Sequence, residues 1–485
     1  MKLGALAERA GIALGGGSDA QVTGFAIDNR KVAPGTVFGA FQGLAVNGED
    51  FIPAAITAGA VAVVARAEAK VKGAIHIADP NPRRAFARLA AGFYTPVPET
   101  IAAVTGTNGK TSTVEMVRQI WRMGGHRSAS IGTLGVTTAD ESVSTGLTTP
   151  DIVTFLANMT GLAREGISHV AYEASSHGLS QYRNEGLTVA AGAFTNLSRD
   201  HLDYHKDMDD YFAAKMRLFD EVVDPAGAGV VWMDDEWSQR AADHVRRRGL
   251  RLLQVGAAAD SDGIRLAGRT PTQLGQTLEI EFGGAVRKLN LPLIGAYQAA
   301  NALVAGGLVL ATGGDAGQVF DALTRLQPVR GRLERAAISR AGAPVYVDYA
   351  HTPDALEAAI AALRPHCSGR LIVVFGAGGD RDTGKRAPMG AVVAGQADLG
   401  IVTDDNPRGE DPAAIRAQVL QGGAGVLQEV GDRRAAIAAA IAEAGAEDIV
   451  LVAGKGHEQG QIVGAGEAMR VLPFDDVTVV RESAA

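Results

Sequence analysis

The stretch IAAVTGTNGKTSTVEMVRQIW, residues 101–121, has the pattern of a buried strand, a glycine-rich loop and a helix. Gly106 and Gly109 let the loop turn tightly and point its backbone N–H groups at a phosphate, and the dipole of the helix adds positive charge there. Lys110 can reach the β- and γ-phosphates of a nucleotide, and the Thr111 hydroxyl can bind Mg²⁺. The predicted ATP-binding residues of this stretch are Gly106, Thr107, Asn108, Gly109, Lys110, Thr111 and Ser112.

The loop is shorter than the common phosphate-binding pattern G-x-x-x-x-G-K-[ST], which would place a glycine where this chain has Val104. An ordinary glycine-rich turn between a strand and a helix is the alternative interpretation. The strand before the loop and the helix after it favour nucleotide binding.

Elsewhere along the chain, apolar runs of strand length alternate with amphipathic helical segments. This pattern predicts an α/β fold with parallel sheets covered on both faces. The proline-containing segment TPVPET, residues 95–100, has the composition of a linker. We predict three domains, over residues 1–97, 98–330 and 331–485.

Polar motifs follow the apolar runs. In parallel sheets, ligands bind beyond the carboxyl ends of the strands, which is where these motifs are expected to lie. They include TGTNGKT and YEASSHG in the second predicted domain, and GAGGDRD, TDDNPR and GKGHE in the third. This placement predicts an active site between these two domains.

The composition of the 485-residue chain limits its compartment and its partners. The net charge is −8 and no basic block occurs, which disfavours a nucleic-acid partner. The single cysteine, Cys367, cannot form an internal disulfide, and we expect an unreactive thiol in a reducing cytoplasm. Glu8 and Arg9 stand where a signal peptide needs an apolar core, and the apolar runs are too short for membrane insertion. We therefore expect a cytoplasmic protein.

The motifs GTNGKTS, EASSHGL, TNLSRDHLDYH, YFAAK, GRLE, DYAHTPD and GKGHE occur in this order, and together the chain resembles the Mur ligase family. Members of this family are ATP-dependent, amide-forming enzymes of peptidoglycan precursor synthesis. The segments EASSHGLSQYR and DNPR are similar to the branch that adds the third residue of the stem peptide to UDP-N-acetylmuramoyl-L-Ala-D-Glu. The resemblance implies a monomer with a small N-terminal α/β domain that binds the nucleotide sugar, a central P-loop ATPase-type parallel sheet and a C-terminal Rossmann-like domain.

Such ligases phosphorylate a substrate carboxylate with ATP, and an incoming amine then displaces phosphate from the acyl phosphate. Because negative charge develops on the transferred group, cations are expected in the site. The resemblance implies that the catalytic residues are Lys110, Lys215 and His201. It implies that Mg²⁺ is bound by Thr111, Glu173, His201 and Lys215.

Lys215 cannot bind Mg²⁺ as an ammonium group, and the resemblance implies that CO₂ converts it to a carbamate, N6-carboxylysine. Carbamate formation requires the neutral amine, which burial favours. A solvated lysine on a helix surface is the alternative. For the base and ribose of ATP, the resemblance implies Asn301, Arg332 and Asp348, with Gln298 where an asparagine is usual.

The nucleotide-sugar dipeptide is expected to contact both the first and the second domain. The N-terminal positions that the resemblance implies are Ile27, Asn29, Leu44, Ala45 and Val46. The central positions are Thr148, Thr149, Ser175, Gln181 and Arg183, whose hydroxyl and guanidinium groups suit a pyrophosphate and carboxylates. Ordinary loop caps are the alternative interpretation for each.

The incoming amino acid distinguishes the members of this branch, some of which add lysine and others meso-diaminopimelate. Arg408 of DNPR is expected to bind the extra carboxylate of diaminopimelate together with Asn406, and Glu458 is expected to pair with its distal ammonium group. Glu410 and Asp411 are expected to be solvated. The implied diaminopimelate-binding residues are Arg381, Asp405, Asn406, Pro407, Arg408, Gly454 and Glu458.

Three alternatives to a diaminopimelate-adding ligase stay open. The nearest is the lysine-adding relative, against which DNPR argues. The second is a ligase similar to folylpolyglutamate synthetase, and the third is a P-loop regulatory switch with no synthetic role.

Overall fold

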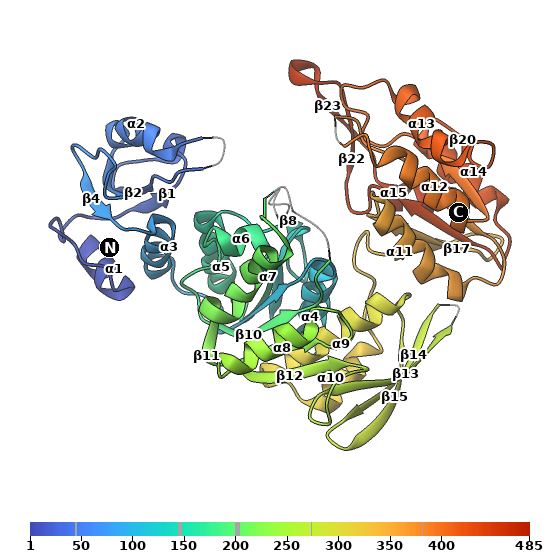
Figure 1. Ribbon diagram of the computed structural model, residues 1–485, viewed down its shortest axis with the longest axis horizontal. Coiled ribbons are helices and arrows are strands. Elements are labelled where there is room, and N and C mark those ends of the chain that lie inside the picture. Colours follow the sequence, from blue (N-terminus) through green and yellow to red (C-terminus); the bar gives the residue numbers. More distant parts are fainter. Residues whose placement is uncertain (44–45, 144–147, 199–203, 273, 381) are drawn as a thin grey trace. The chain divides into compact units, whose positions relative to one another are not determined.

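The computed structural model describes residues 1–43, 46–143, 148–198, 204–272, 274–380 and 382–485, and it divides into two compact units (Figure 1). The first unit comprises Met1–Arg265, Phe282–Gly284 and Asn301–Ala322. The second unit comprises Leu266–Glu281, Ala285–Ala300 and Leu323–Ala485. None of the helices in the described ranges is long and apolar enough to cross a bilayer.

The N-terminal part of the first unit is a four-stranded sheet in the order β1-β2-β3-β4, and neighbouring strands pair in parallel. The strands are β1 (Gly24–Ala26), β2 (Thr36–Gly39), β3 (Ala60–Ala65) and β4 (Ile75–Ala78). The helices of this part are α1 (Leu3–Ala10), α2 (Ile52–Thr57) and α3 (Pro82–Phe93). Phe25 and Phe86 pack edge to face, with ring centroids 5.4 Å apart, in the core between the sheet and the helices.

The larger sheet of the first unit has the strand order β12-β11-β10-β5-β9-β6-β7-β8, and its strands from β12 to β6 pair in parallel. These strands are β5 (Thr100–Thr105), β6 (Ser128–Gly132), β7 (Gly135–Thr137), β8 (Ser142–Val143), β9 (His169–Glu173), β10 (Val189–Phe194), β11 (Val223–Trp232) and β12 (Arg251–Gly256). Three further strands, β13 (Ile264–Thr272), β14 (Gly275–Phe282) and β15 (Ala285–Leu291), neighbour one another in that order.

Most strands from β5 to β12 are followed by a helix, in line with the alternating sequence pattern, whereas β6, β7 and β8 are consecutive. The helices of the central region are α4 (Lys110–Met123), α5 (Ile152–Arg164), α6 (Ser176–Ser180), α7 (Met208–Arg217), α8 (Ser238–Arg247), α9 (Ala296–Ala311) and α10 (Ala316–Leu323). Strand β5 is central in the sheet, and Ala102, Ala103 and Val104 are fully buried because both of its faces are covered. Helix α4 packs on β5, β6 and β9, while α8 packs on β11 and β12.

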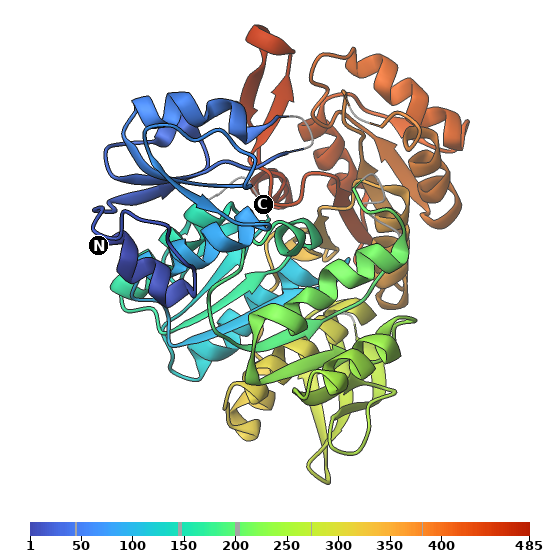
Figure 2. The same ribbon diagram turned by 60° about the vertical axis from the view of Figure 1, so that its left-hand side comes forward.

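The second unit contains a six-stranded sheet in the order β16-β17-β21-β18-β19-β20, parallel except for β16. Its strands are β16 (Glu334–Ile338), β17 (Pro344–Asp348), β18 (Leu371–Phe375), β19 (Leu399–Val402), β20 (Gln428–Glu429) and β21 (Ile449–Ala453). A separate antiparallel hairpin, β22 (Gly460–Val463) and β23 (Arg470–Pro473), projects from this unit (Figures 1 and 2). The helices are α11 (Pro353–Leu363), α12 (Arg386–Gln396), α13 (Pro412–Leu420), α14 (Arg433–Glu443) and α15 (Asp476–Ala484).

Two cores cover the two faces of the six-stranded sheet, and β18 contributes to both because its side chains alternate. Leu371, Val373 and Phe375 face the core that α11, α12 and α13 complete. Ile372 and Val374 face the core that α14 and α15 complete. This is the doubly covered parallel sheet that the sequence predicts, so the fold class is confirmed.

A buried ion pair fastens α14 to α15 on one side of this sheet. Arg433 donates to both carboxylate oxygens of Asp476 at 2.8 and 2.7 Å, and its side chain also donates to the Ala453 carbonyl at the end of β21. The two side chains are 2% and 0% exposed. Burial lowers the pKa of Arg433, but the charge and hydrogen bonds of Asp476 outweigh this effect and leave the pKa above its usual value.

Replacing one member of this pair should destabilise the second unit locally. We expect Asp476→Asn to lower the free energy of unfolding by about 3–5 kcal/mol, because it leaves a buried guanidinium without its counter-charge. Hydrogen exchange of peptides covering β21 and α14 measures this, whereas tryptophan fluorescence does not, since Trp121, Trp232 and Trp237 all lie in the first unit.

The neighbouring pair Arg434–Glu482 offers a matched control, because it joins the same two helices with side chains 56% and 55% exposed. Glu482→Gln should cost less than about 1 kcal/mol. Equal protection changes in the two variants would contradict the importance that we assign to burial.

Candidate functional site

In the first unit, polar residues gather at the carboxyl ends of neighbouring parallel strands. Val104 of β5 is in register with Glu173 of β9, and Thr105 is in register with Phe194 of β10. The glycine-rich loop follows β5, and Thr195 follows β10. The strand order therefore brings three sequence motifs to one edge of the sheet, as predicted for a ligand site.

The glycine-rich loop approaches its neighbours so closely that two positions require glycine. Gly106 has φ 146° and Gly109 has φ 85°, a backbone region that favours glycine. A Cβ at Gly106 would collide with the hydroxyl of Thr195, and a Cβ at Gly109 would collide with the amide oxygen of Asn301. Asn301, predicted from the motif on α9, is thus placed directly against the loop.

Two lysines converge on the loop. Lys110 Nζ donates to the carbonyls of Gly106 and Thr107 at 2.8 and 2.7 Å, and Lys215 Nζ donates to the Gly106 carbonyl at 2.7 Å. Lys215 is 1% exposed and lies 4.2 Å from the centre of the Tyr211 ring. Lys215 is therefore a buried residue of the loop region, and the alternative of a solvated helix lysine is excluded.

Several residues that hold the loop were not singled out from the sequence. Thr195 donates to the Asn108 carbonyl at 2.7 Å, and the side chain of Asn196 accepts from Asn108 N–H at 2.8 Å. The hydroxyls of Tyr211 and Thr107 lie 3.3 Å apart. The motif TNLSRDH contains a signal for them, because its first two residues, Thr195 and Asn196, are these loop supports.

The Mg²⁺ ligands expected from the sequence are only partly within the described residues. Glu173 is 2% exposed and accepts from Thr133 N–H at 2.7 Å, and Thr111 is 7% exposed at the start of α4. His201 lies outside the described residues. No cluster of three or more His, Cys, Asp or Glu side chains occurs among the residues that the structure describes. A carboxylate and a hydroxyl beside a phosphate loop nevertheless fit Mg²⁺, which commonly takes its remaining ligands from phosphates and water.

The central residues expected to contact the nucleotide-sugar dipeptide form one connected group. Thr149 Oγ1 donates to the Glu173 carbonyl at 2.9 Å and lies 2.8 Å from Ser175 Oγ. Arg183 donates to the Thr149 carbonyl at 2.8 Å and to Gln181 Oε1 at 2.8 Å. Burial lowers the pKa of Arg183. Such a half-buried guanidinium is suited to an anionic ligand.

Thr148 completes this group through Thr133, since their hydroxyls lie 3.1 Å apart. The N-terminal positions are not joined to it by any hydrogen bond within the described ranges. Ile27 is 37% exposed, Asn29 begins a short 3₁₀ helix, and Val46 is 58% exposed. Leu44 and Ala45 lie outside the described residues.

In the second unit, Arg332 and Asp348 are held close together by their loops. Asp348, at the end of β17, accepts from Leu333 N–H at 2.7 Å and from Ala350 N–H at 2.9 Å. Burial raises the pKa of Asp348, and the positive charge of Arg332 opposes this. The Arg332 guanidinium lies 4.9 Å from the centre of the Tyr349 ring, and Gln298 donates to the Arg332 carbonyl at 2.9 Å.

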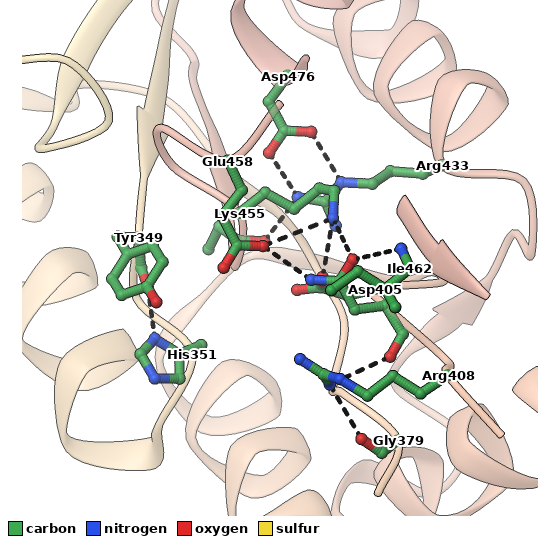
Figure 3. A network of polar contacts seen from close by, with 12 residues as sticks. Tyr349, His351, Gly379, Asp405, Arg408, Arg433, Lys455, Glu458, Ile462 and Asp476 are labelled. Carbon is green, nitrogen blue, oxygen red and sulfur yellow. Dashed lines mark hydrogen bonds and ion pairs between the residues drawn. The ribbon is translucent and has the colours of Figure 1, made fainter. Parts of the chain in front are cut away.

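The segment DNPR forms a strained turn after β19. Asn406 and Arg408 have φ values of 45° and 51°, which place both residues in the left-handed region on either side of the buried Pro407. Arg408 N–H donates to the Ile462 carbonyl at 3.0 Å, so the turn is fastened to β22. The guanidinium Nη1 donates to the Gly379 carbonyl at 2.9 Å (Figure 3). Among the described residues, Nε and Nη2 of Arg408 have no hydrogen-bond partner.

Gly454 and Glu458 lie beside this turn, as expected from the sequence. Gly454 has φ 122°, and a Cβ there would collide with the Asp405 carboxylate. Glu458 Oε2 accepts from Asn406 Nδ2 at 2.7 Å. Arg381 lies outside the described residues.

The expectation that Glu410 is merely solvated is wrong, whereas Asp411 is exposed as expected. Glu410 accepts from the fully buried Arg386 at 2.8 and 2.9 Å, because that guanidinium needs a counter-charge. Glu410 also accepts from Asp380 N–H at 2.6 Å, which ties the turn to the loop after β18. Asp411 caps the N-terminus of α13 by accepting from Ala413 N–H.

The chain matches three family models that together cover most of its length. Residues 21–103 match "Mur ligase family, catalytic domain", residues 104–309 match "Mur ligase middle domain", and residues 331–456 match "Mur ligase, glutamate ligase domain". Among solved structures, a UDP-N-acetylmuramoyl-L-alanyl-D-glutamate--2,6-diaminopimelate ligase is 32% identical with a TM-score of 0.76, over 100% of this chain and 99% of that one. MurF from Acinetobacter baumannii, at 17% identity and a TM-score of 0.63, shares the fold over 93% of this chain and 95% of that one.

Curated relatives are similar over nearly the full length. The UDP-N-acetylmuramoyl-L-alanyl-D-glutamate--2,6-diaminopimelate ligase of Zymomonas mobilis is 61% identical over 465 residues, which is 96% of this chain and 95% of that protein. The protein of the same name from Bradyrhizobium diazoefficiens is 52% identical, over 94% of this chain and 93% of that protein. From these matches and the shared fold, the chain belongs to the Mur ligase family.

Proposed function

We propose that this protein is an ATP-dependent ligase that joins meso-2,6-diaminopimelate to UDP-N-acetylmuramoyl-L-alanyl-D-glutamate. The observation that carries the proposal is the turn at residues 405–408, which carries Arg408 and holds the Glu458 carboxylate through Asn406. A guanidinium and a carboxylate are complementary to the distal carboxylate and ammonium of diaminopimelate, whereas lysine has only the ammonium. The relatives at 61% and 52% identity carry the name of this activity, which supports the proposal.

The proposed reaction has two steps. A carboxylate of the dipeptide attacks the γ-phosphorus of ATP, and this forms an acyl phosphate and ADP. The amine of diaminopimelate then attacks the acyl carbon, so that an amide bond forms, phosphate leaves and the amine loses a proton. Lys110 is assigned to the phosphates of ATP, where its positive charge stabilises the transferred group.

Glu173, Thr111, His201 and a carbamate on Lys215 are assigned to Mg²⁺, which would neutralise phosphate charge when bound. The burial of Lys215 supports the carbamate, because burial disfavours a charged ammonium group. Asn301, Arg332 and Asp348 are assigned to the base and ribose of ATP. The connected hydroxyl and guanidinium group around Thr149 is assigned to the nucleotide-sugar dipeptide.

We further propose the domain boundaries, the oligomeric state and the compartment of the protein. We place the domain boundaries after residues 97 and 330, and the ranges of the three family models support this placement. We further propose that the protein acts as a monomer in the cytoplasm, where its small-molecule substrates are made.

The proposed function predicts strict substrate dependence of ATP turnover. ADP release should require both the nucleotide-sugar dipeptide and diaminopimelate, because the acyl phosphate forms only on the dipeptide and is consumed only by the amine. A coupled ADP assay with each substrate omitted in turn measures this. Substrate-independent slow turnover would instead indicate a regulatory switch, and efficient use of lysine would indicate the lysine-adding alternative.

Arg408→Gln tests how the amino acid is selected. We expect kcat/KM for diaminopimelate to fall by more than about tenfold, since a charge-assisted hydrogen-bonded pair contributes about 1.5–3 kcal/mol. Any residual activity with lysine should change little, because lysine lacks the distal carboxylate. A parallel loss with both amino acids would show that the variant damages the turn and not the selectivity.

The carbamate assignment is tested with Lys215→Ala. Activity should fall about 10- to 100-fold, and short carboxylates such as formate or acetate should restore part of it by supplying the missing oxygens. Lys206→Ala, which removes an exposed lysine of the same region, serves as the control. Unchanged activity of Lys215→Ala would refute the assignment.

A further inference from the structure

Lys455 is a completely buried cation in the second unit that the proposed function does not use (Figure 3). Its Nζ lies 2.9 Å from Asn406 Oδ1, 3.4 Å from Asp405 Oδ1 and 3.8 Å from Glu458 Oε2. Burial lowers the pKa of Lys455, and the negative charges of Asp405 and Glu458 oppose this effect. Both carboxylates therefore favour the charged form of the Lys455 side chain.

The amide of Asn406 has a fixed orientation inside this network. Ile462 N–H donates to Asn406 Oδ1 at 2.9 Å, and the Lys455 ammonium donates to the same oxygen. The amide nitrogen therefore faces Glu458 and donates to its carboxylate. Because the Asn406 oxygen is engaged within the protein, this residue orients Glu458, and its oxygen is not the group that receives the substrate.

The charges of the network do not cancel. Arg433 and Asp476 neutralise each other in a buried pair. Lys455 and Asp405 are also buried, with side chains 0% and 7% exposed, whereas the Glu458 side chain is 36% exposed. Among these ion-paired groups, two cations therefore face three carboxylates, and Glu458 is the most exposed of the three. Arg408 is not part of these pairs, because its guanidinium donates to the backbone carbonyls of Gly379 and Asn406.

We propose that Asp405 and Lys455 are positioning residues that keep Glu458 available for the distal ammonium of diaminopimelate. Asp405 occupies the ammonium group of Lys455 and so prevents Lys455 from neutralising Glu458. Without Asp405, Lys455 would take the place of the substrate's cation. This inference rests on the proposed function. In it, Asp405 does not contact the substrate but keeps Glu458 available by holding Lys455.

Asp405→Asn tests the inference, because it removes the charge and keeps the shape. The variant is assayed with diaminopimelate and with 2-aminopimelate, which has the same carbon chain and both carboxylates but lacks the distal amine. We expect kcat/KM for diaminopimelate to fall at least about tenfold, mainly through KM, while that for 2-aminopimelate changes little. An equal loss with both amino acids would overturn the proposal.

The double variant Asp405→Asn/Lys455→Met gives a second, independent readout. It again leaves Glu458 as the uncompensated carboxylate, so KM for diaminopimelate should return to within about threefold of the unmodified enzyme. Lys455→Met alone also leaves Glu458 without a competing protein cation, so its KM for diaminopimelate should not rise by more than about threefold. A KM in the double variant as high as that of Asp405→Asn would contradict the proposal.

Asp404→Asn is the matched control, since Asp404 is adjacent in the chain but pairs with Arg416. Its KM for diaminopimelate should be unchanged, and a rise equal to that of Asp405→Asn would count against the proposal. Melting temperatures report whether each variant folds. If Lys455→Met does not fold, the ratio of kcat/KM for diaminopimelate to kcat/KM for 2-aminopimelate in Asp405→Asn tests the proposal. Failure of the unmodified enzyme to use diaminopimelate would instead contradict the proposed function.

Discussion

Parallel strands covered on both faces leave only their ends for chemistry, and this constraint organises both units. The central strands are almost entirely apolar, so polar side chains that must meet a ligand can stand only where a strand stops. In the first unit the glycine-rich loop after β5 is held by Thr195 after β10, and Glu173 ends β9 at the same edge of the sheet. In the second, the segments after β17, β18, β19 and β21 carry the residues proposed for the nucleotide and the amino acid.

Charges buried at these ends are paired, and the way they are paired differs between structural ion pairs and the proposed amino-acid site. Arg386 with Glu410 and Arg433 with Asp476 are closed pairs that hold loops and helices in place. The site proposed for the amino acid differs, because one cation, Lys455, is shared between the carboxylates of Asp405 and Glu458. The Glu458 side chain is 36% exposed, so it can receive the cation of a ligand.

The sequence predicted the fold class and the strand, loop and helix around Lys110, since local periodicity and glycine spacing determine these features. It did not predict the partners of buried charges, because they are separated along the chain. The sequence pattern around the buried Lys455 does not differ from that around a solvated lysine. Glu410 was expected to be solvated because its partner, Arg386, lies 24 positions away in the chain. The support that Thr195 gives to the glycine-rich loop was missed for the same reason, as its partner, the Asn108 carbonyl, lies 87 positions earlier in the chain.

In the proposed reaction, a carboxylate of the dipeptide is activated as an acyl phosphate before the amine attacks. The direct measurement labels that carboxylate with ¹⁸O and follows the label by mass spectrometry during ATP-dependent ligation of diaminopimelate. We expect one labelled oxygen in each released phosphate and one in the new amide. Release of unlabelled phosphate during amide formation would contradict it.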